Sequence, residues 1–338
     1  MGKEKNMTLE LIKLFAAYMV VFIHVMFQGE FGVLVDALAR FAVPLFFWVS
    51  GFFSYGISTE KIKNRIKHIL FLIVFSVAAY TAFNLFRLAS YGGISYVFAY
   101  FKKYLSLKTL VELVVFNLPI SSAHLWYLFS ALYVYLLYYF AVKQHLREKI
   151  VYIISGCLLI LHLILGEVLS VFGIVTPILI VRNFALMGVP FFALGLFTKR
   201  YGDRLKKVKI YQLAIIMAIG IVGTVFSRRK FGENELYVGS LAVLFVMICV
   251  LLRFKNAQIP AIFQKLSSCS TYIYIFHIMV SDVIYMGYSF LGINNTEVAI
   301  LNTMHPIIVC IATTVFALVL NEIMDKIFKK KPIKKQAE

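Results

Sequence analysis

Long apolar runs alternate with short polar stretches along the whole chain. Runs of 18 or more apolar residues recur, and each is long enough to cross a bilayer core about 30 Å thick. Lipid offers the backbone no hydrogen-bond partner, so each span must be a helix or part of a closed barrel. The runs are continuous rather than alternating, which excludes a barrel and predicts an all-α, polytopic membrane protein.

The pattern predicts about ten transmembrane helices in a single bundle. Residues 91–123 are expected to form an external amphipathic cap, and residues 167–181 either extend the sixth helix or re-enter the membrane. One membrane domain fills residues 7–328, and a basic cytoplasmic tail follows at 329–338. The expected helices, with boundaries uncertain by about two to four residues, are 8–28, 34–57, 69–89, 124–142, 149–166, 180–198, 210–227, 236–252, 270–291 and 302–327.

Composition and charge agree with a membrane protein. Hydrophobic residues make up 61% of the chain and charged residues 15%, against about half and a quarter in soluble domains. Of the 34 Lys and Arg residues, 24 lie in the polar stretches on the side of the N-terminus and 7 on the opposite side. Because basic residues gather in cytoplasmic loops, both termini are expected in the cytoplasm. The same rule accounts for the net charge of +18 without a nucleic-acid partner.

The four cysteines form no C-x-x-C pair, so we expect neither a disulfide framework nor a metal site. The expected first helix carries Glu10, Lys13 and His24, and at 100° per residue all three share one face. Glu10 and Lys13 can neutralise each other, and His24 lies about 16 Å further along the helix. The stripe is either a polar path toward a titratable imidazole or an anchor pair with an interfacial histidine.

The second expected helix carries Asp36 and Arg40, spaced as an i,i+4 pair, and then Pro44. Pro44 should bend this helix and free backbone groups facing the bundle. Running inward, the helix places Arg40 at about the depth of His24, where a guanidinium suits a developing oxyanion. Alternatively, Arg40 reaches out to lipid headgroups.

Five segments in order resemble acyltransferase family 3, the integral-membrane O-acyltransferases: 10–24, 40–51, 124–128, 182–195 and 270–277. The resemblance covers the whole chain and implies a single acyltransferase-3-like domain. In this chain Glu10 and Lys13 stand where the family usually has Asp and Arg. Lys supplies the charge of Arg but not its planar fork.

The resemblance implies that His24 is the catalytic residue, either as the base that deprotonates a hydroxyl or as a transient acyl carrier. Arg40 would stabilise the oxyanion or orient the acceptor. The implied donor is cytosolic acyl-CoA, with acetyl-CoA expected, and no metal takes part. The implied acceptor is a hydroxyl of a cell-envelope glycan or a lipid-linked sugar.

Further polar residues have two interpretations each. His124, Trp126 and Tyr127 would contact a sugar ring or belong to an interfacial aromatic belt. Arg182 would meet an acidic acceptor or anchor its helix at the interface. His277 would belong to the donor stripe with Glu10 and Lys13, or be structural. The remaining histidines are expected to make local hydrogen bonds (His162, His305) or to lie at solvated loop edges (His68, His145).

The basic runs 61–67 and 199–209 would hold the phosphates of coenzyme A, or only set topology and attract anionic lipid. Two other functions remain open at this point. A transporter of polysaccharide or a small amino acid would use the same polar stripe, and a scaffold would tolerate substitution of His24 and Arg40. Membrane lipid is an expected partner, and the sequence permits a homo-oligomer.

Overall fold

A computed structural model describes residues 7–119, 121–254, 260–293 and 295–329, and the secondary structure of these residues is helical. Seven of the described helices are long and apolar enough to cross a membrane, and Val238–Arg253 is a shorter apolar helix. The all-α, polytopic membrane fold is therefore confirmed. The seven candidate spans are Gly29–Phe52, Thr59–Ser90, Ala123–Lys143, Glu148–Val171, Ile210–Phe231, Ser270–Phe290 and Leu301–Ile327.

The chain divides into two compact units, which are described separately below. The first unit comprises Met1–Ala39 and Arg253–Glu338, and the second comprises Arg40–Leu252. The helices of the first unit are α1 (Met7–His24), α2 (Gly29–Ala39), α14 (Ala261–Ser268), α15 (Ser270–Phe290) and α16 (Asn295–Lys329). Of the expected basic tail, residues 330–338 lie outside the described residues.

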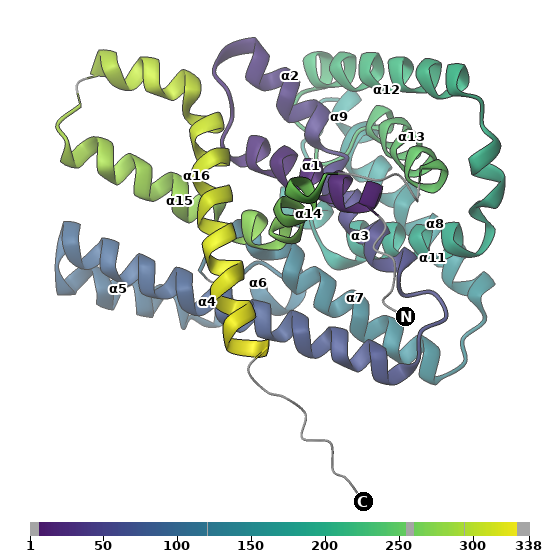
Figure 1. Cartoon of the computed structure of the whole chain (residues 1–338), viewed down its shortest axis with the longest axis horizontal. Coiled ribbons are helices and arrows are strands. Elements are labelled where there is room, and N and C mark those ends of the chain that lie inside the picture. Colours follow the sequence, from purple (N-terminus) through teal and green to yellow (C-terminus); the bar gives the residue numbers. More distant parts are fainter. Residues whose placement is uncertain (1–6, 120, 255–259, 294, 330–338) are drawn as a thin grey trace, which may run out of the picture. The chain divides into compact units, whose positions relative to one another are not determined.

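In the first unit, α1 packs against α2, α14, α15 and α16. Small and β-branched residues on its buried face, among them Ala16, Ala17 and Val20, let the neighbouring helices come close. The Tyr18 hydroxyl lies 2.8 Å from Thr314 Oγ1, which ties α1 to α16. Helices α15 and α16 lie next to each other as the light green and yellow ribbons of Figure 1.

The second unit holds the remaining helices. They are α3 (Ala42–Phe52), α4 (Thr59–Gly92), α5 (Ile94–Tyr104), α6 (Leu107–Phe116), η1 (Ala123–Leu125), α7 (Trp126–Lys143), α8 (Glu148–Leu163), η2 (Ile164–Val168), α9 (Leu169–Val171), α10 (Ile178–Val181), η3 (Phe184–Gly188), α11 (Val189–Tyr201), η4 (Gly202–Lys207), α12 (Ile210–Phe231) and α13 (Val238–Arg253). Helices α4 and α7 run side by side in blue (Figure 1).

Helices α3 and α11 approach each other backbone to backbone. A Cβ atom added at Gly51 of α3 would lie 1.9 Å from the Phe192 carbonyl oxygen, and one at Gly195 of α11 would lie 2.1 Å from the Trp48 carbonyl oxygen. Neither position tolerates a side chain, which explains the glycines at the ends of the segments 40–51 and 182–195. This contact fixes α3 relative to the helix that follows Arg182.

Each of the ten expected segments contains a helix, but two of them are interrupted. The segment 34–57 breaks at Arg40 and Phe41, between α2 and α3. Pro44 has no N–H to donate to the Arg40 carbonyl four residues back, so the interruption falls where Pro44 was expected to disturb the helix. The segment 180–198 consists of α10, the π-helical segment η3 and α11.

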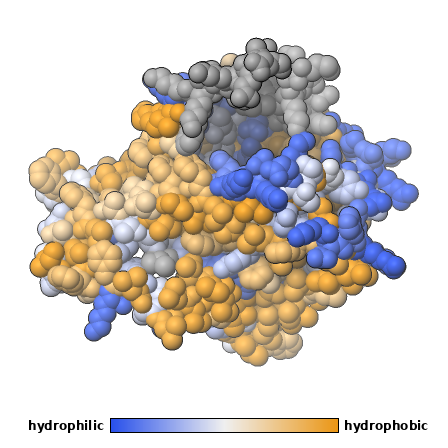
Figure 2. All heavy atoms as spheres, turned by 90° about the horizontal axis from the view of Figure 1, so that it is seen from below, coloured by the Kyte–Doolittle hydropathy of each residue, from blue (hydrophilic) through white to orange (hydrophobic). Residues whose placement is uncertain are grey.

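The two regions left open by the sequence are also helical in part. Residues 91–123 contain the short amphipathic helices α5 and α6, in agreement with the expected amphipathic character. Residues 164–171 extend α8 through a π-helical segment, so the span reaches Val171 before the chain turns at Gly173. Apolar side chains cover much of the face shown in Figure 2, as expected of a surface that meets lipid.

Candidate active site

The polar stripe of α1 begins with an ion pair. Lys13 Nζ lies 2.8 Å from Glu10 Oε1, and both side chains are largely shielded from solvent. The expected i,i+3 pair is therefore present, one turn into the helix. It neutralises two charges that would be costly alone where water is largely excluded.

His24 is the last residue of α1, and its ring packs on His277 of α15. The two ring centroids are 5.3 Å apart with an interplanar angle of 31°. His24 is half-buried, whereas His277 is completely buried. The structure thus brings the expected catalytic histidine and a residue of the expected donor stripe into direct contact, which sequence analysis did not predict.

The tautomer of neutral His277 follows from its hydrogen bonds. Its Nδ1 lies 2.8 Å from the Tyr274 carbonyl oxygen and 3.3 Å from that of Ile273. A carbonyl oxygen only accepts, so Nδ1 must carry the hydrogen and Nε2 holds the lone pair. The ring that supports His24 is therefore fixed in orientation by its own helix.

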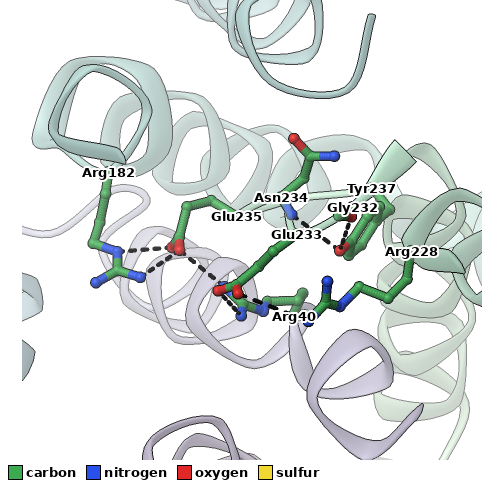
Figure 3. Close-up of polar contacts among 8 residues, drawn as sticks. All are labelled: Arg40, Arg182, Arg228, Gly232, Glu233, Asn234, Glu235 and Tyr237. Carbon is green, nitrogen blue, oxygen red and sulfur yellow. Dashed lines mark hydrogen bonds and ion pairs between the residues drawn. The ribbon is translucent and has the colours of Figure 1, made fainter. Parts of the chain in front are cut away.

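Arg40 stands at the interruption that precedes α3, and two carboxylates hold it. Its Nη1 donates to Glu235 Oε1 at 2.8 Å, and its Nη2 donates to Glu233 Oε1 at 2.9 Å. The Arg40 side chain is only 4% exposed. This burial does not fit the interpretation of Arg40 as a headgroup anchor. Both carboxylates come from the loop between α12 and α13 (Figure 3).

Two more arginines meet the same loop. Arg182 forms a bidentate pair with Glu235, donating from Nε to Oε2 at 2.9 Å and from Nη2 to Oε1. Arg228 Nη2 lies 3.7 Å from Glu233 Oε2. Figure 3 shows the two glutamates lying between the three guanidinium groups. We call these five residues the arginine cluster; with three positive and two negative charges it carries a net charge of +1.

The loop that carries the glutamates is held in place at both ends. The buried Tyr237 hydroxyl donates to the Gly232 carbonyl and accepts from the Asn234 N–H, at 3.2 and 3.0 Å. At the start of α13, the Val238 N–H donates to Glu167 Oε2 at 2.6 Å. A carboxylate at this position caps the helix N-terminus. The arginine cluster is therefore a preorganised feature of the second unit.

Glu235 remains ionised despite its burial. Burial alone would raise the pKa of this carboxyl, but the guanidinium groups of Arg182 and then Arg40 outweigh it and hold the pKa below its usual value. One carboxylate thus compensates two arginines in a water-poor place. By contrast, the Glu233 side chain is 54% exposed, so it is the carboxylate that water or a ligand can reach.

Aromatic residues adjoin the cluster. The Arg182 guanidinium lies 6.0 Å from the ring centre of Trp126, which begins α7 and is buried. Tyr127 packs on Phe47 with ring centroids 4.7 Å apart. His124 lies beyond them, with Nδ1 2.7 Å from Ser122 Oγ and its ring against Tyr80. Burial of Trp126 and His124 does not fit an exposed interfacial belt.

The described contacts form two groups. In the first unit, α1 carries the Glu10–Lys13 pair and brings His24 to His277. In the second unit, Arg182 joins Trp126 to the carboxylates that hold Arg40. The placement of His24 and Arg40 at one depth of the membrane stays a prediction. His305 makes the local hydrogen bond expected of it, with Nε2 2.9 Å from Ser281 Oγ.

Sequence analysis missed Glu233, Glu235 and Arg228. The signal was present in Gly-Glu-Asn-Glu at 232–235, a cluster of acids between two apolar runs. The charge alternation already placed Arg182 and Arg228 in the polar stretches opposite the N-terminus, which include this loop. The positive-inside rule uses only the basic residues of these stretches, so it gave no reason to pair Glu233 and Glu235 with the arginines.

The comparison with protein families gives one result. The family model described as an acyltransferase domain matches residues 7–322, nearly the whole chain. The chain therefore belongs to acyltransferase family 3, and it is a multi-pass membrane acyltransferase that uses an acyl donor. This membership favours an enzyme over the transporter and the scaffold. Comparisons with curated proteins and with solved structures give no match.

Proposed function

We propose that the enzyme transfers an acetyl group from cytosolic acetyl-CoA to a hydroxyl of a cell-envelope glycan or a lipid-linked sugar. The observation that carries the proposal is the placement of His24, a half-buried imidazole at the end of a helix that begins with an ion pair. Its ring rests on His277, whose orientation is fixed. A supported imidazole of this kind suits general base catalysis near neutral pH.

In the proposed reaction, His24 removes the proton of the acceptor hydroxyl as its oxygen attacks the thioester carbonyl carbon. A tetrahedral oxyanion forms, the carbon–sulfur bond breaks, and the thiolate of coenzyme A takes the proton back from His24. If His24 itself carries the acetyl group, its ring nitrogen attacks the thioester first and the acceptor oxygen attacks the resulting acyl-imidazole. If the protein is incubated with labelled acetyl-CoA in the absence of acceptor, label retained on the protein indicates the route through acetylated His24.

The arginine cluster is proposed to receive the acceptor. Both terminal nitrogens of Arg40 are bonded to carboxylates, so its role is to orient the acceptor rather than to meet the oxyanion first. An acidic or phosphate group on the acceptor can replace the exposed Glu233 on Arg40 and Arg228. Trp126 beside Arg182 offers an aromatic face for the sugar ring.

The donor is proposed to enter from the side of the basic runs. Both termini and the run 199–209 are assigned to the cytoplasm, where acetyl-CoA is made. Exposed bases of this run, such as Arg204 and Lys207, can hold the phosphates of coenzyme A. Lys206 and Arg200 are already paired with Asp203 and Glu148.

The test is acetyl transfer by His24→Ala. Membranes containing the enzyme and its native envelope are incubated with labelled acetyl-CoA, and label on the glycan is measured. Transfer should fall about 10²- to 10⁴-fold, the usual contribution of a general base, while the protein stays inserted at the same level. His68→Ala, at an exposed position of α4, is the matched control and should retain transfer. Full transfer by His24→Ala would refute the assignment.

A further inference from the structure

A pocket in the second unit is separate from the arginine cluster. It has a volume of about 590 Å³ and lies between α7, α8 and α11, next to the connection from α3 to α4. Arg40 precedes the start of α3, whereas Tyr55 and Ile57 at the pocket follow its end. The 11 residues of α3 separate the two places by about 16 Å. The pocket is therefore not part of the candidate active site.

The walls of this pocket are apolar along most of its length. On α8 the lining extends from Glu148 to Ser155, about 10 Å of helix, and on α7 it extends over a similar length. This approaches the depth of one leaflet, about half of a 30 Å hydrocarbon core. The apolar lining consists of Val134, Leu137, Ala141 and Val142 of α7, Val151 and Ile154 of α8, and Val189, Phe192, Ala193 and Leu196 of α11.

A hydrogen-bonded carboxylate lies at one end of the pocket. There Glu148 accepts hydrogen bonds from the Tyr152 hydroxyl at 3.1 Å and from the Tyr55 hydroxyl at 3.5 Å. Arg200 of α11 forms an ion pair with the same carboxylate. We call this end of the pocket its mouth. It lies where α3 and α11 end and α8 begins.

Basic residues flank this mouth. Lys143 at the end of α7, Arg147 before α8 and Lys149 in its first turn are exposed and adjoin the lining residues Val142 and Glu148 in the sequence. Arg200, which pairs with Glu148, is exposed as well. Glu148 is paired with Arg200, which leaves Lys143, Arg147 and Lys149 as an excess of positive charge next to the mouth. An apolar groove about one leaflet deep, ending in an excess of basic side chains, is complementary to an acyl chain that ends in a negatively charged headgroup.

We propose that this pocket binds one anionic phospholipid, with an acyl chain between α7, α8 and α11 and its phosphate at the mouth, next to the flanking bases. The tyrosine hydroxyls beside Glu148 lie at the level of the headgroup, where amphipathic side chains gather in membrane proteins. The bound lipid fills the space that α7, α8 and α11 line. The occupant is a lipid of the surrounding bilayer and not the acyl donor.

The experiment is native mass spectrometry of the full chain released from detergent. The purified protein is supplied in separate arms with phosphatidylglycerol, with phosphatidylcholine of the same chains, and with palmitoyl-CoA. The proposal expects one phosphatidylglycerol to be retained in preference to phosphatidylcholine. Equal retention of the two lipids, or retention of palmitoyl-CoA in place of phosphatidylglycerol, would overturn it.

Adjacent residues of α8 provide matched variants. Ser155 lines the pocket, so Ser155→Leu places extra carbon atoms in it and should remove the retained lipid. A side chain at Gly156 meets nothing within 4 Å, so Gly156→Leu should retain the lipid. Unchanged retention in Ser155→Leu would contradict the proposed position of the chain.

The headgroup is tested by charge reversal. Arg147→Glu next to the mouth should reduce the preference for phosphatidylglycerol over phosphatidylcholine at least about fivefold, since each base near a membrane surface attracts anionic lipid by about that factor. Lys102→Glu, at an exposed position of α5, should leave the preference unchanged. The comparison of the two lipids on the unaltered protein tests the proposal even if a variant is unstable.

Discussion

At Glu235, one carboxylate compensates two guanidinium groups. It is 9% exposed and contacts both Arg40 and Arg182. Removing one partner of a buried ionic network leaves uncompensated charge, which is more costly than the net stabilisation that the network provides. Glu233 contacts Arg40 as well, but from a half-exposed position where water can replace it.

We therefore expect Glu235→Gln and Glu233→Gln to differ in stability. Glu235→Gln should destabilise the enzyme by about 3–5 kcal/mol, because the buried Arg40 and the partly buried Arg182 lose their shared counter-charge. Glu233→Gln should cost less than about 1 kcal/mol. Thermal unfolding in detergent measures both, with Glu233→Gln as the matched control from the same loop. Equal melting temperatures for the two variants would show that the network is not buried as described.

The Glu235 carboxyl should also make the stability of the enzyme depend on pH in the acid range. Its folded-state pKa lies below the usual value of 4.5, so the stabilisation is complete above that pH and is lost as pH falls through the lowered pKa. Melting temperatures should therefore be insensitive to this group between pH 5 and 7 and should fall below about pH 4.5. In Glu235→Gln the decrease in melting temperature at low pH should be smaller. If the decrease is the same as in the unaltered enzyme, it arises from other carboxyl groups.

Individual residues also show the limit of sequence reasoning. Helical periodicity placed Glu10 and Lys13 on one face with His24, and the first two are indeed paired. The contact of His24 with His277 joins residues far apart in the sequence, so no local spacing could predict it. The partners of Arg40 lie 193 and 195 residues away for the same reason.

At the scale of helices, the chain predicts where helices occur better than where they break. Each of the ten expected segments contains a helix, and seven of the described helices are long and apolar enough to cross a membrane, because burial in lipid dictates their length. Pro44 indicated the interruption before α3. The π-helical segments Ile164–Val168 and Phe184–Gly188 have no comparable sequence signal. Both adjoin residues around the arginine cluster, since Glu167 caps α13 and Arg182 precedes η3, and such π-helical segments are frequent at functional sites.

The crossing of α3 and α11 predicts an effect of added volume. Gly51→Ala places a methyl group where the Phe192 carbonyl lies 1.9 Å away, so the two helices must separate. We expect a loss of about 1–3 kcal/mol or more, together with reduced acetyl transfer, because α3 follows Arg40 and α11 continues from η3, which follows Arg182. Thermal unfolding and the transfer assay measure the two effects.

Gly156→Ala in α8 is the control for that substitution. Its added methyl group meets nothing within 4 Å, so stability and transfer should stay within experimental error of the unaltered enzyme. A Gly51→Ala variant as stable as Gly156→Ala would mean that α3 and α11 do not pack through their backbones.

At the scale of the whole molecule, the family match extends over residues that belong to both compact units. The first unit carries His24 and His277, and the second carries the arginine cluster. The sequence placed Arg40 at about the depth of His24 and predicted that both termini lie in the cytoplasm. These two statements concern the whole protein in its membrane, so local spacing and helix packing within a unit cannot establish them.

The most direct measurement is an experimental structure of the enzyme with a non-hydrolysable analogue of acetyl-CoA. Our account predicts that the carbon replacing the thioester carbonyl lies about 3–3.5 Å from the His24 ring or from an acceptor oxygen bonded to it. An analogue bound with its acyl end elsewhere, and His24 enclosed by packed aliphatic side chains, would contradict the account.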